Sequence, residues 1–210
     1  NLIVSIGEFR SRLLAQDLNS INGKIIKINK NNKSIEIISM GHRNPQGLTI
    51  DKDTNLIYSS EHGPKGGDEI NTIDTTKTIQ NYGWPISSYG EHYGNEKKEN
   101  SELYKIAPLF KSHKDHGFIE PTKNYTPSIG ISELILFDML NQKILLASSL
   151  GNNVSEGDMS LHIYFFDKDN LKKYKSITLN ERIRDMLYLE KKNLIILFLE
   201  STSSIGVIKL

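Results

Sequence analysis

The stretch GLTIDKDTNLIYSSEH, residues 47–62, carries the pattern that decides the fold. A short apolar run enters an acidic turn, and a second apolar run begins at an asparagine and ends in serines. The same pattern returns in LILFDMLNQKILLASSL (134–150) and in MLYLEKKNLIILFLESTSS (186–204). Apolar runs of this length joined by turn residues predict antiparallel hairpins, and three copies of one unit indicate a repeat architecture.

Further apolar runs of strand length surround these hairpins, whereas long helical periodicity is scarce. We expect strands at residues 2–9, 24–29, 34–40, 47–50, 55–60, 69–74, 131–138, 142–149, 161–167, 173–179, 183–189, 193–200 and 204–210. A spacing of roughly 8–12 residues is typical of all-β sandwiches, barrels and propellers. The repeats favour an all-β β-propeller made of four-stranded blades, with a sandwich of tandem hairpins as the alternative.

The expected strands group into about four blades within one partial β-propeller domain, residues 1–210. Their approximate ranges are 1–40, 41–79, 127–179 and 182–210. Residues 80–126 show no clear strand pattern, and we expect a long irregular loop there. Loops of that length are uncommon without a functional or structural reason.

Composition and charge restrict the class of protein. The 210 residues are 37% hydrophobic and 24% charged, which is typical of a globular chain. The net charge is +1, so we expect no nucleic-acid partner, and any preference for anions must come from a local cluster. The absence of cysteine excludes disulfides and thiolate metal sites. No apolar run reaches the ~18 residues of a membrane span.

Two polar segments, GHRNPQG (41–47) and SSEHGPKGGDEIN (59–71), flank the first hairpin. Antiparallel strands joined by a tight turn bring their far ends together, so Arg43 and Asn44 should lie near His62. Arg43 suits a planar carboxylate, which a guanidinium binds in bidentate fashion. A plain charged loop, with Arg43 paired to a nearby carboxylate, is the alternative.

The glycines of GPKGGD (63–68) free the backbone to direct several carbonyl groups one way. Converging carbonyls beside Asp68 and Glu69 would suit Ca²⁺, a hard cation that prefers oxygen ligands.

Three motifs in this order, GHRNPQGL, SSEHGPKGGDEIN and NYGWP (81–85), resemble the soluble glucose/sorbosone dehydrogenase family. AQDLNSINGKIIKI (15–28) and ERIRDMLYL (181–189) extend the resemblance to most of the chain. It implies a six-bladed β-propeller that oxidises aldose sugars with pyrroloquinoline quinone (PQQ) and Ca²⁺. The chain would represent about the C-terminal two-thirds of a family member.

The resemblance also implies roles for individual residues. Arg43 and Asn44 would contact the quinone, the carbonyls of Gly63 and Pro64 would hold Ca²⁺, His62 and Asp68 would lie beside the ion, and Arg182 and Arg184 would bind cofactor carboxylates. PQQ carries three carboxylates, so arginines together with a cation match its chemistry.

The chain departs from the family pattern in the cofactor pocket. No histidine matches the catalytic general base, which we expect upstream of this chain. The pocket lysine is missing from SSLGNNVSEGDMSLHIYFF (148–166), and Thr126 stands where the family has an aromatic residue. We interpret His42 as structural. The pair His113 and His116 could bind a metal, although a flexible loop is the simpler interpretation.

These observations lead to two main hypotheses. The first is an aldose dehydrogenase domain, incomplete here and inactive by itself, acting outside the cytoplasm (periplasmic or secreted) as family members do. The alternative is a non-catalytic propeller binding module that keeps a Ca²⁺ loop. A hydrolase has little support, because no nucleophile–base set stands out. Since a blade needs roughly 40–50 residues, the chain cannot close six blades, and exposed blade edges predict self-association.

Overall fold

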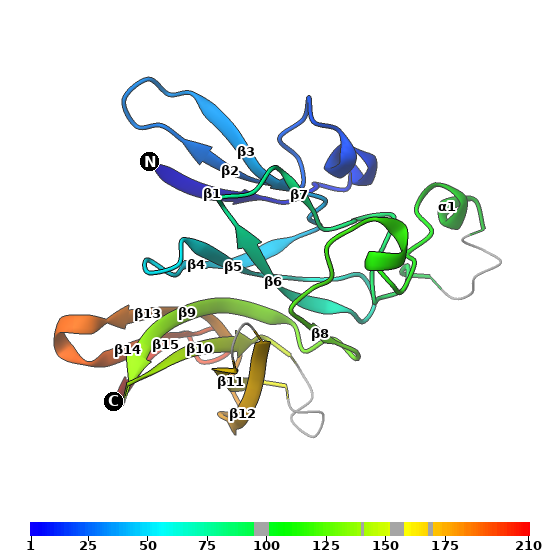
Figure 1. Ribbon diagram of the computed structural model, residues 1–210. Helices are drawn as coiled ribbons and strands as arrows, with labels where there is room; N and C mark the ends of the chain where they lie inside the picture. The colour runs from blue at the N-terminus through cyan, green and yellow to red at the C-terminus, as the bar shows by residue number, and fades with distance from the viewer. Residues whose placement is uncertain (95–100, 140, 152–157, 168–169) are drawn as a thin grey trace.

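The computed structural model describes residues 1–94, 101–139, 141–151, 158–167 and 170–210. Its described residues form four small β-sheets arranged side by side along an arc (Figure 1). The prediction of an all-β chain is confirmed. A two-sheet sandwich is excluded, because the strands fall into four separate sheets.

Two sheets come mainly from the N-terminal part of the chain. The first has the order β1 (Leu2–Ile6), β2 (Lys24–Ile28), β3 (Ile35–Met40) and β7 (Gln80–Asn81). The second has the order β4 (Pro45–Ile50), β5 (Leu56–Glu61), β6 (Asp68–Asp74) and β8 (Lys123–Tyr125). All neighbouring strands are antiparallel except β3 and β7, which are parallel.

The other two sheets are simple antiparallel meanders. The third has the order β12 (Asn170–Thr178), β11 (Ser160–Asp167), β10 (Gln142–Ser149) and β9 (Ile131–Met139). The fourth contains β13 (Ile183–Leu189), β14 (Leu194–Leu199) and β15 (Ser204–Lys209). The helical elements are short: η1 (Arg12–Gln16), α1 (Ser101–Ile106), η2 (Lys114–His116) and η4 (Glu190–Lys192).

The expectation of an irregular loop over residues 80–126 is wrong in part. β7 and β8 come from this segment and supply the fourth strands of the first two sheets, and α1 and η2 lie between them. Strands of two or three residues carry no detectable alternation, so only their distant pairing partners define them.

The repeated hairpin pattern has a backbone cause. The asparagines that precede the second strand of each repeat, Asn55, Asn141 and Asn193, have φ angles of 60°, 61° and 54°. Asparagine tolerates this left-handed conformation better than most residues, because its short polar side chain can bond locally. The three turns therefore reverse the chain in the same way.

The innermost strands β1, β4, β9 and β13 lie next to one another in that order. Buried serines join β4, β9 and β13 near the starts of these strands. Ser60 Oγ accepts from Gly47 N at 2.9 Å and donates to the carbonyl of Ser132, whose own hydroxyl donates to the carbonyl of Ile183 at 2.5 Å. These bonds place the starts of β4, β9 and β13 on the same side of the molecule.

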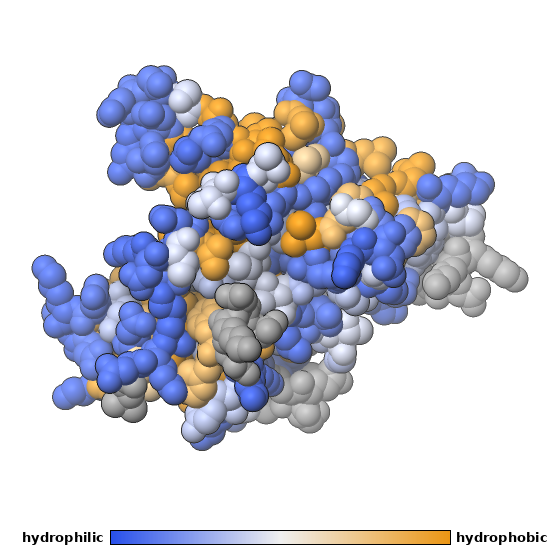
Figure 2. Space-filling view, in the orientation of Figure 1, coloured by the Kyte–Doolittle hydropathy of each residue, from blue (hydrophilic) through white to orange (hydrophobic). Residues whose placement is uncertain are grey.

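The hydrophobic core lies between sheets, in three clusters. Ile25, Ile57 and Ile73 join the first and second sheets; Tyr58, Ile70, Ile131, Leu134 and Leu145 join the second and third; Ile135, Leu146, Ile183, Met186 and Ile195 join the third and fourth. Because these clusters lie between sheets, each sheet depends on a neighbour to bury its apolar face. By contrast, polar residues cover the β2–β3 hairpin tip (Figure 2).

The outer face of the fourth sheet is apolar and has no neighbour among the described residues. Phe198 pairs with Ile205 and Ile196 pairs with Val207 across β14 and β15, and Ile205 and Val207 are 59% and 60% exposed.

No helix in the described part of the chain is long and apolar enough to cross a membrane.

Candidate functional site

The β4–β5 hairpin brings the two polar motifs together. Pro45 lies opposite Glu61, and the amide of His62 donates to the carbonyl of Asn44 at 3.0 Å. Arg43 Nη1 donates to the carbonyl of His62 at 2.8 Å. Arg43 and Asn44 therefore lie beside His62, as the hairpin geometry predicts.

Arg43 also meets the third motif. Its guanidinium carbon lies 5.5 Å from the ring centroid of Trp84, within NYGWP. A guanidinium over an indole face is an attractive arrangement that also fixes the direction of the side chain. The half-buried arginine therefore keeps a defined position. Its bond to His62 uses only one of the guanidinium's N–H donors.

The loop after β5 is folded too tightly to carry a side chain at its first glycine. A Cβ on Gly63 would lie 2.0 Å from the carbonyl oxygen of Gly67, and Gly66 and Gly67 have φ angles of 78° and 79°. No described residue donates a hydrogen bond to the carbonyl oxygens of Gly63 or Pro64.

Asp68 holds this loop in place. Its Oδ1 accepts from Gly63 N at 3.2 Å and its Oδ2 accepts from Ile131 N at 3.0 Å. Both oxygens of the buried carboxylate are thus engaged by backbone amides. In the folded chain Asp68 orders the glycine loop and ties the second sheet to the third.

His42 is a structural residue. Its Nε2 lies 2.8 Å from Ser39 Oγ, its Nδ1 lies 3.2 Å from Glu61 Oε2, and its ring stacks on Tyr82 at 4.9 Å. The side chain is fully buried. With both ring nitrogens occupied, His42 supports the Arg43 segment and does not face a ligand.

A cavity of about 410 Å³ lies beside Arg43 and Asn44, and Glu8 at the end of the first inner strand forms part of its wall. Glu8 is buried, and its Oε2 has no hydrogen-bond partner among the described residues. Burial raises the pKa of Glu8 against the opposing charge of Arg43. His62 Nε2 is likewise buried without a hydrogen-bond partner in the described part of the chain.

Sequence reasoning missed Glu8. The only signal was a single acidic residue directly after the first strand and Gly7, which is too short to stand out from an ordinary turn.

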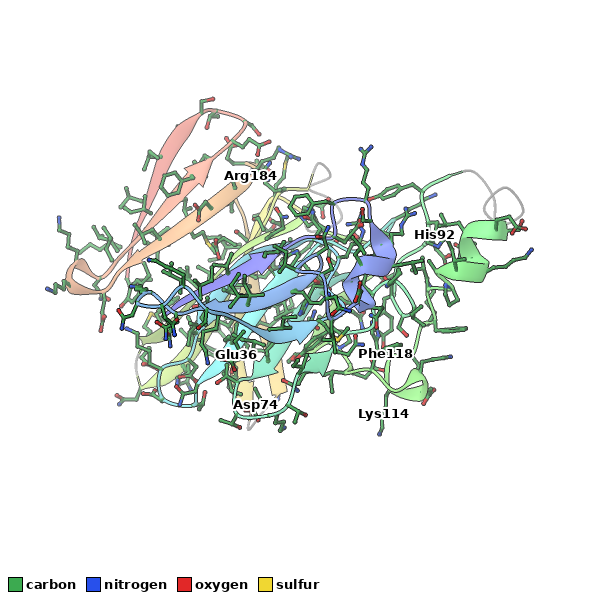
Figure 3. The ribbon with its side chains drawn as sticks, turned by 90° about the horizontal axis from the view of Figure 1, so that it is seen from above. Glu36, Asp74, His92, Lys114, Phe118 and Arg184 are labelled. Atoms are coloured by element: carbon green, nitrogen blue, oxygen red, sulfur yellow. The ribbon has the colours of Figure 1, made fainter. Side chains whose placement is uncertain are left out.

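Arg182 lies directly before β13, and Arg184 is the second residue of that strand (Figure 3). They share one carboxylate: Glu200 accepts from Arg182 Nε at 3.1 Å and from Arg184 Nε at 2.6 Å. The bonds from Arg184 and Arg182 lower the pKa of Glu200. Glu181 adds a second carboxylate here, and its Oε1 accepts from the backbone amide of Arg182 at 2.9 Å.

Arg182 is further fixed by the carbonyls of Leu150 and Gly151, each 2.8 Å from its Nη1. The next residues, 152–157, belong to the segment from which the expected pocket lysine is missing, and they lie outside the described residues.

His113 and His116 do not form a metal pair, and the expectation of a flexible loop is wrong for His113. His113 is buried, with its ring nitrogens each 3.6 Å from a carboxylate oxygen, one of Glu69 and one of Glu120. Burial lowers the pKa of His113. His116 instead stacks on Phe110 at 3.8 Å. Within the described ranges no group of three His, Cys, Asp or Glu side chains could hold a metal ion.

A buried carboxylate lies between the inner strands. Glu133 on β9 accepts from Leu134 N at 2.8 Å and from Leu48 N at 3.3 Å, and it faces Asp185 on β13. Burial first, and then the negative charge of Asp185, raises the pKa of Glu133 to about 7.

We expect Glu133 to make stability depend on pH. In the unfolded chain this carboxyl loses its proton near its ordinary pKa of 4.5, whereas in the folded chain it keeps the proton until the pH reaches about 7. Its contribution is therefore full below pH 4.5 and is lost as the pH rises through about 7. Urea unfolding over this range should show a smaller loss of stability with rising pH for Glu133→Gln than for wild type. Parallel curves would contradict the assignment.

The decisive comparison concerns the whole chain. The family model described as Glucose / Sorbosone dehydrogenase matches residues 1–205. The chain belongs to this family.

Individual glucose/sorbosone dehydrogenase relatives are also similar to the chain. The chain is 37% identical over 109 residues to the aldose sugar dehydrogenase YliI of Escherichia coli, covering 46% of this chain and 29% of that protein. The crystal structure of the soluble aldose sugar dehydrogenase from Escherichia coli in its apo form matches with a TM-score of 0.77 at 23% identity, covering 99% of this chain and 60% of that one. The prediction of a β-propeller is confirmed.

A PQQ-bound aldose sugar dehydrogenase from Streptomyces coelicolor matches with a TM-score of 0.61 at 22% identity, covering 91% of this chain and 50% of that structure. The chain thus spans less than two thirds of the length of each of these relatives.

Proposed function

We propose that this chain supplies the PQQ and Ca²⁺ site of a dehydrogenase that oxidises aldose sugars. The observation that carries the proposal is the meeting of Arg43, Asn44 and His62 beside a cavity at the start of β4. Family membership and the PQQ-bound relative from Streptomyces coelicolor support it.

The residues present fit these groups. Arg43, with Asn44 beside it, offers hydrogen-bond donors to a carboxylate, and Arg182 and Arg184 near the start of β13 supply two further guanidinium groups. The carbonyls of Gly63 and Pro64 would bind Ca²⁺, which prefers oxygen ligands. His62 Nε2 is a buried polar atom left for a ligand. When bound, PQQ would supply the acceptor for the sugar's hydride.

Within this arrangement, other residues of the chain orient Arg43 and support the glycine loop. Trp84 fixes the Arg43 guanidinium, and Asp68 orders the glycine loop through two backbone amides. We place Asp68 beside the ion, where its role is to shape the glycine loop. The general base that takes the sugar's proton is expected from a segment outside this chain, so the 210 residues alone should bind without turnover.

The second candidate is a binding module that keeps the Ca²⁺ loop and performs no redox chemistry. The missing pocket lysine favours it. For either function we propose a periplasmic or secreted location and an aldose sugar as the small-molecule ligand.

PQQ titration distinguishes the two functions. Addition of PQQ should quench the fluorescence of the single tryptophan, Trp84, in a saturable manner. Binding should be tighter when Ca²⁺ is present. The full-length gene product should then couple aldose oxidation to dye reduction. Binding without dye reduction in the full-length protein would select the binding module, and absence of PQQ binding with Ca²⁺ present would rule out the dehydrogenase site.

We further propose that the outer face of the fourth sheet binds a second copy of the chain. The face presents Leu187, Phe198, Ile205 and Val207, and apolar sheet faces associate readily in water. Replacing Ile205 and Val207 together with lysine should shift the sedimentation profile from dimer to monomer. Ser204→Lys, on the same strand, is the matched control. A wild-type chain that sediments as a monomer at all concentrations would contradict this proposal.

A further inference from the structure

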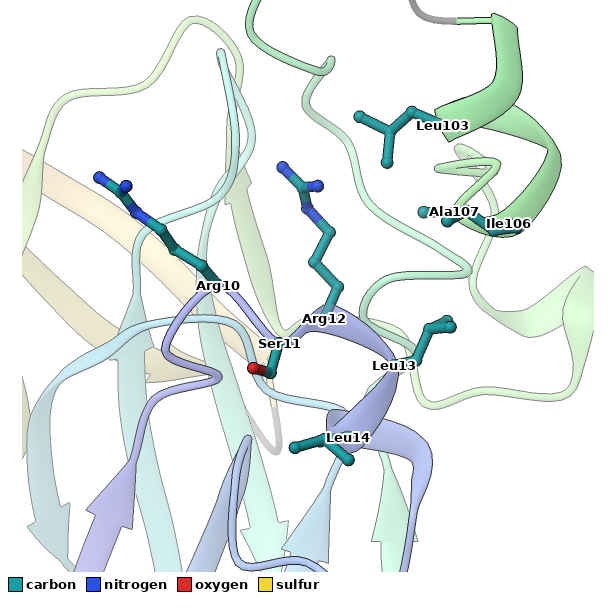
Figure 4. A pocket seen from close by; sticks show the side chains of 8 residues that line it. All are labelled: Arg10, Ser11, Arg12, Leu13, Leu14, Leu103, Ile106 and Ala107. Atoms are coloured by element: carbon teal, nitrogen blue, oxygen red, sulfur yellow. The ribbon is translucent and has the colours of Figure 1, made fainter.

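A shallow groove of about 330 Å³ separates η1 from α1 and shares Arg10 with the cavity beside Arg43 (Figure 4). Leu13 and Leu14 of η1 form one wall, Leu103 and Ile106 of α1 form the other, and Arg10 and Arg12 extend at the rim. Hydrophobic residues gather on the surface between these two elements (Figure 2). The groove therefore combines apolar walls with two cations.

The leucines of η1 are held outward by a rigid support. Lys24 is fully buried, and its Nζ donates to the carbonyls of Leu14 and Ala15 at 2.9 Å and to that of Asn22 at 2.8 Å. Gln16 Nε2 donates to the carbonyl of Trp84 at 2.6 Å. A buried ammonium bound by three carbonyls fixes the turn, so the exposure of Leu13 and Leu14 does not result from a loose loop.

The space beneath the groove is already filled. Ala15, Trp84 and Leu109 form a small buried cluster that also contacts Tyr104. Leu13 and Ile106 cannot turn inward without displacing it, and they are 52% and 55% exposed. Phe9, on a left-handed turn with φ 51°, is 75% exposed. Phe9 lines the cavity beside Arg43, so η1 and α1 are the two elements that present large apolar side chains to solvent at the groove.

Arg10 and Arg12 make the groove positive, and their charges act on the buried carboxyl of Glu8. No described carboxylate forms an ion pair with Arg10 or Arg12. Glu102, the acidic residue of α1, is bound by Lys105 at 2.6 Å, and Glu8 is buried. The guanidinium groups are therefore free to bind an external anion, preferably a phosphate.

We propose that this surface docks peripherally on an anionic lipid bilayer. Protruding leucine, isoleucine and phenylalanine side chains would enter the headgroup boundary, while Arg10 and Arg12 bind lipid phosphates. Apolar side chains on both walls of a shallow groove fit a bilayer better than one narrow ligand. Arg10 also lines the cavity beside Arg43, so docking would turn that cavity toward the membrane. The inference does not depend on PQQ binding.

Vesicle sedimentation tests the proposal with the 210-residue chain. It should bind vesicles that contain phosphatidylglycerol and should bind pure phosphatidylcholine vesicles much more weakly. Replacing Arg10 and Arg12 together with glutamine should weaken binding to anionic vesicles by about twentyfold, as expected for the loss of two cations near the surface. Leu13→Ser should weaken it by roughly tenfold, because less apolar area enters the interface.

Matched controls lie on β3 and on the β4–β5 turn. Ile35→Ser removes a side chain of similar exposure, and Lys52→Gln removes an exposed cation; neither should change vesicle binding. Three results would overturn the proposal: no vesicle binding, equal loss in the control variants, or saturation of the groove by monomeric decyl sulfate with no binding to vesicles. The last would indicate a site for a single anionic amphiphile.

Discussion

Replacing Leu145 with alanine will lower the free energy of unfolding by about 2–5 kcal/mol, the range for removing a buried leucine side chain from a core. Leu145 is fully buried on β10, in the cluster that joins the second and third sheets through Tyr58, Ile70 and Leu134. Each sheet buries its apolar face only against its neighbours, so a cavity here weakens the contact between two blades as well as one strand. Urea unfolding followed by circular dichroism measures the change.

The matched control is Leu187→Ala on β13, where the same side chain is 50% exposed. Its effect should remain within about 0.5 kcal/mol, as for most surface substitutions. Both variants are best compared in an Ile205→Lys background, which suppresses association through the fourth sheet. Equal effects at the two positions would show that the boundary between the second and third sheets is not a cohesive core.

Replacing Arg43 with glutamine will weaken PQQ binding by about tenfold to 150-fold. This range corresponds to roughly 1.5–3 kcal/mol for a hydrogen bond to a charged group. Glutamine keeps a donor and much of the length of arginine but loses the charge and the planar fork that binds a carboxylate. Tryptophan quenching at fixed Ca²⁺ measures affinity, and the circular dichroism spectrum checks that the fold is intact.

Lys52→Gln on the β4–β5 turn removes the same charge at the opposite end of the hairpin and should leave PQQ affinity unchanged. An equal affinity for Arg43→Gln and wild type would assign Arg43 the structural role that its bond to the His62 carbonyl already provides. In that case PQQ binding, if present, would depend on other residues, and the proposed contacts of Arg43 would be wrong.

The sequence predicted the hairpins and the meeting of Arg43 with His62, because both follow from local rules. Alternating apolar runs define strands, and a turn asparagine such as Asn55 reverses the chain at a fixed place. Once the turn is fixed, pairing determines which residues lie opposite one another. The repeat marks one hairpin in each of the second, third and fourth sheets, whereas the first sheet carries no copy of it.

Other features depend on partners far along the chain and left no local signal. Lys24 stands in a strand pattern that predicts an exposed lysine, yet three backbone carbonyls surround its ammonium group. The glycine loop suggested Asp68 as a ligand-side carboxylate, but an amide from Ile131 takes one of its oxygens. Glu200, which binds Arg182 and Arg184, lies in an otherwise ordinary turn. Such contacts exist only in the folded chain.

The two short strands β7 and β8 have a consequence for the order of folding. β7 belongs to the first sheet but follows all three long strands of the second, and β8 returns to the second sheet only after the α1 segment. Neither sheet can be completed before the chain has been made as far as residue 81 or 125, respectively. The third and fourth sheets, by contrast, pair only sequence neighbours, so their loop-closure cost is small. We therefore expect the first two sheets to form one slow cooperative unit during synthesis, with the last two assembling rapidly against it.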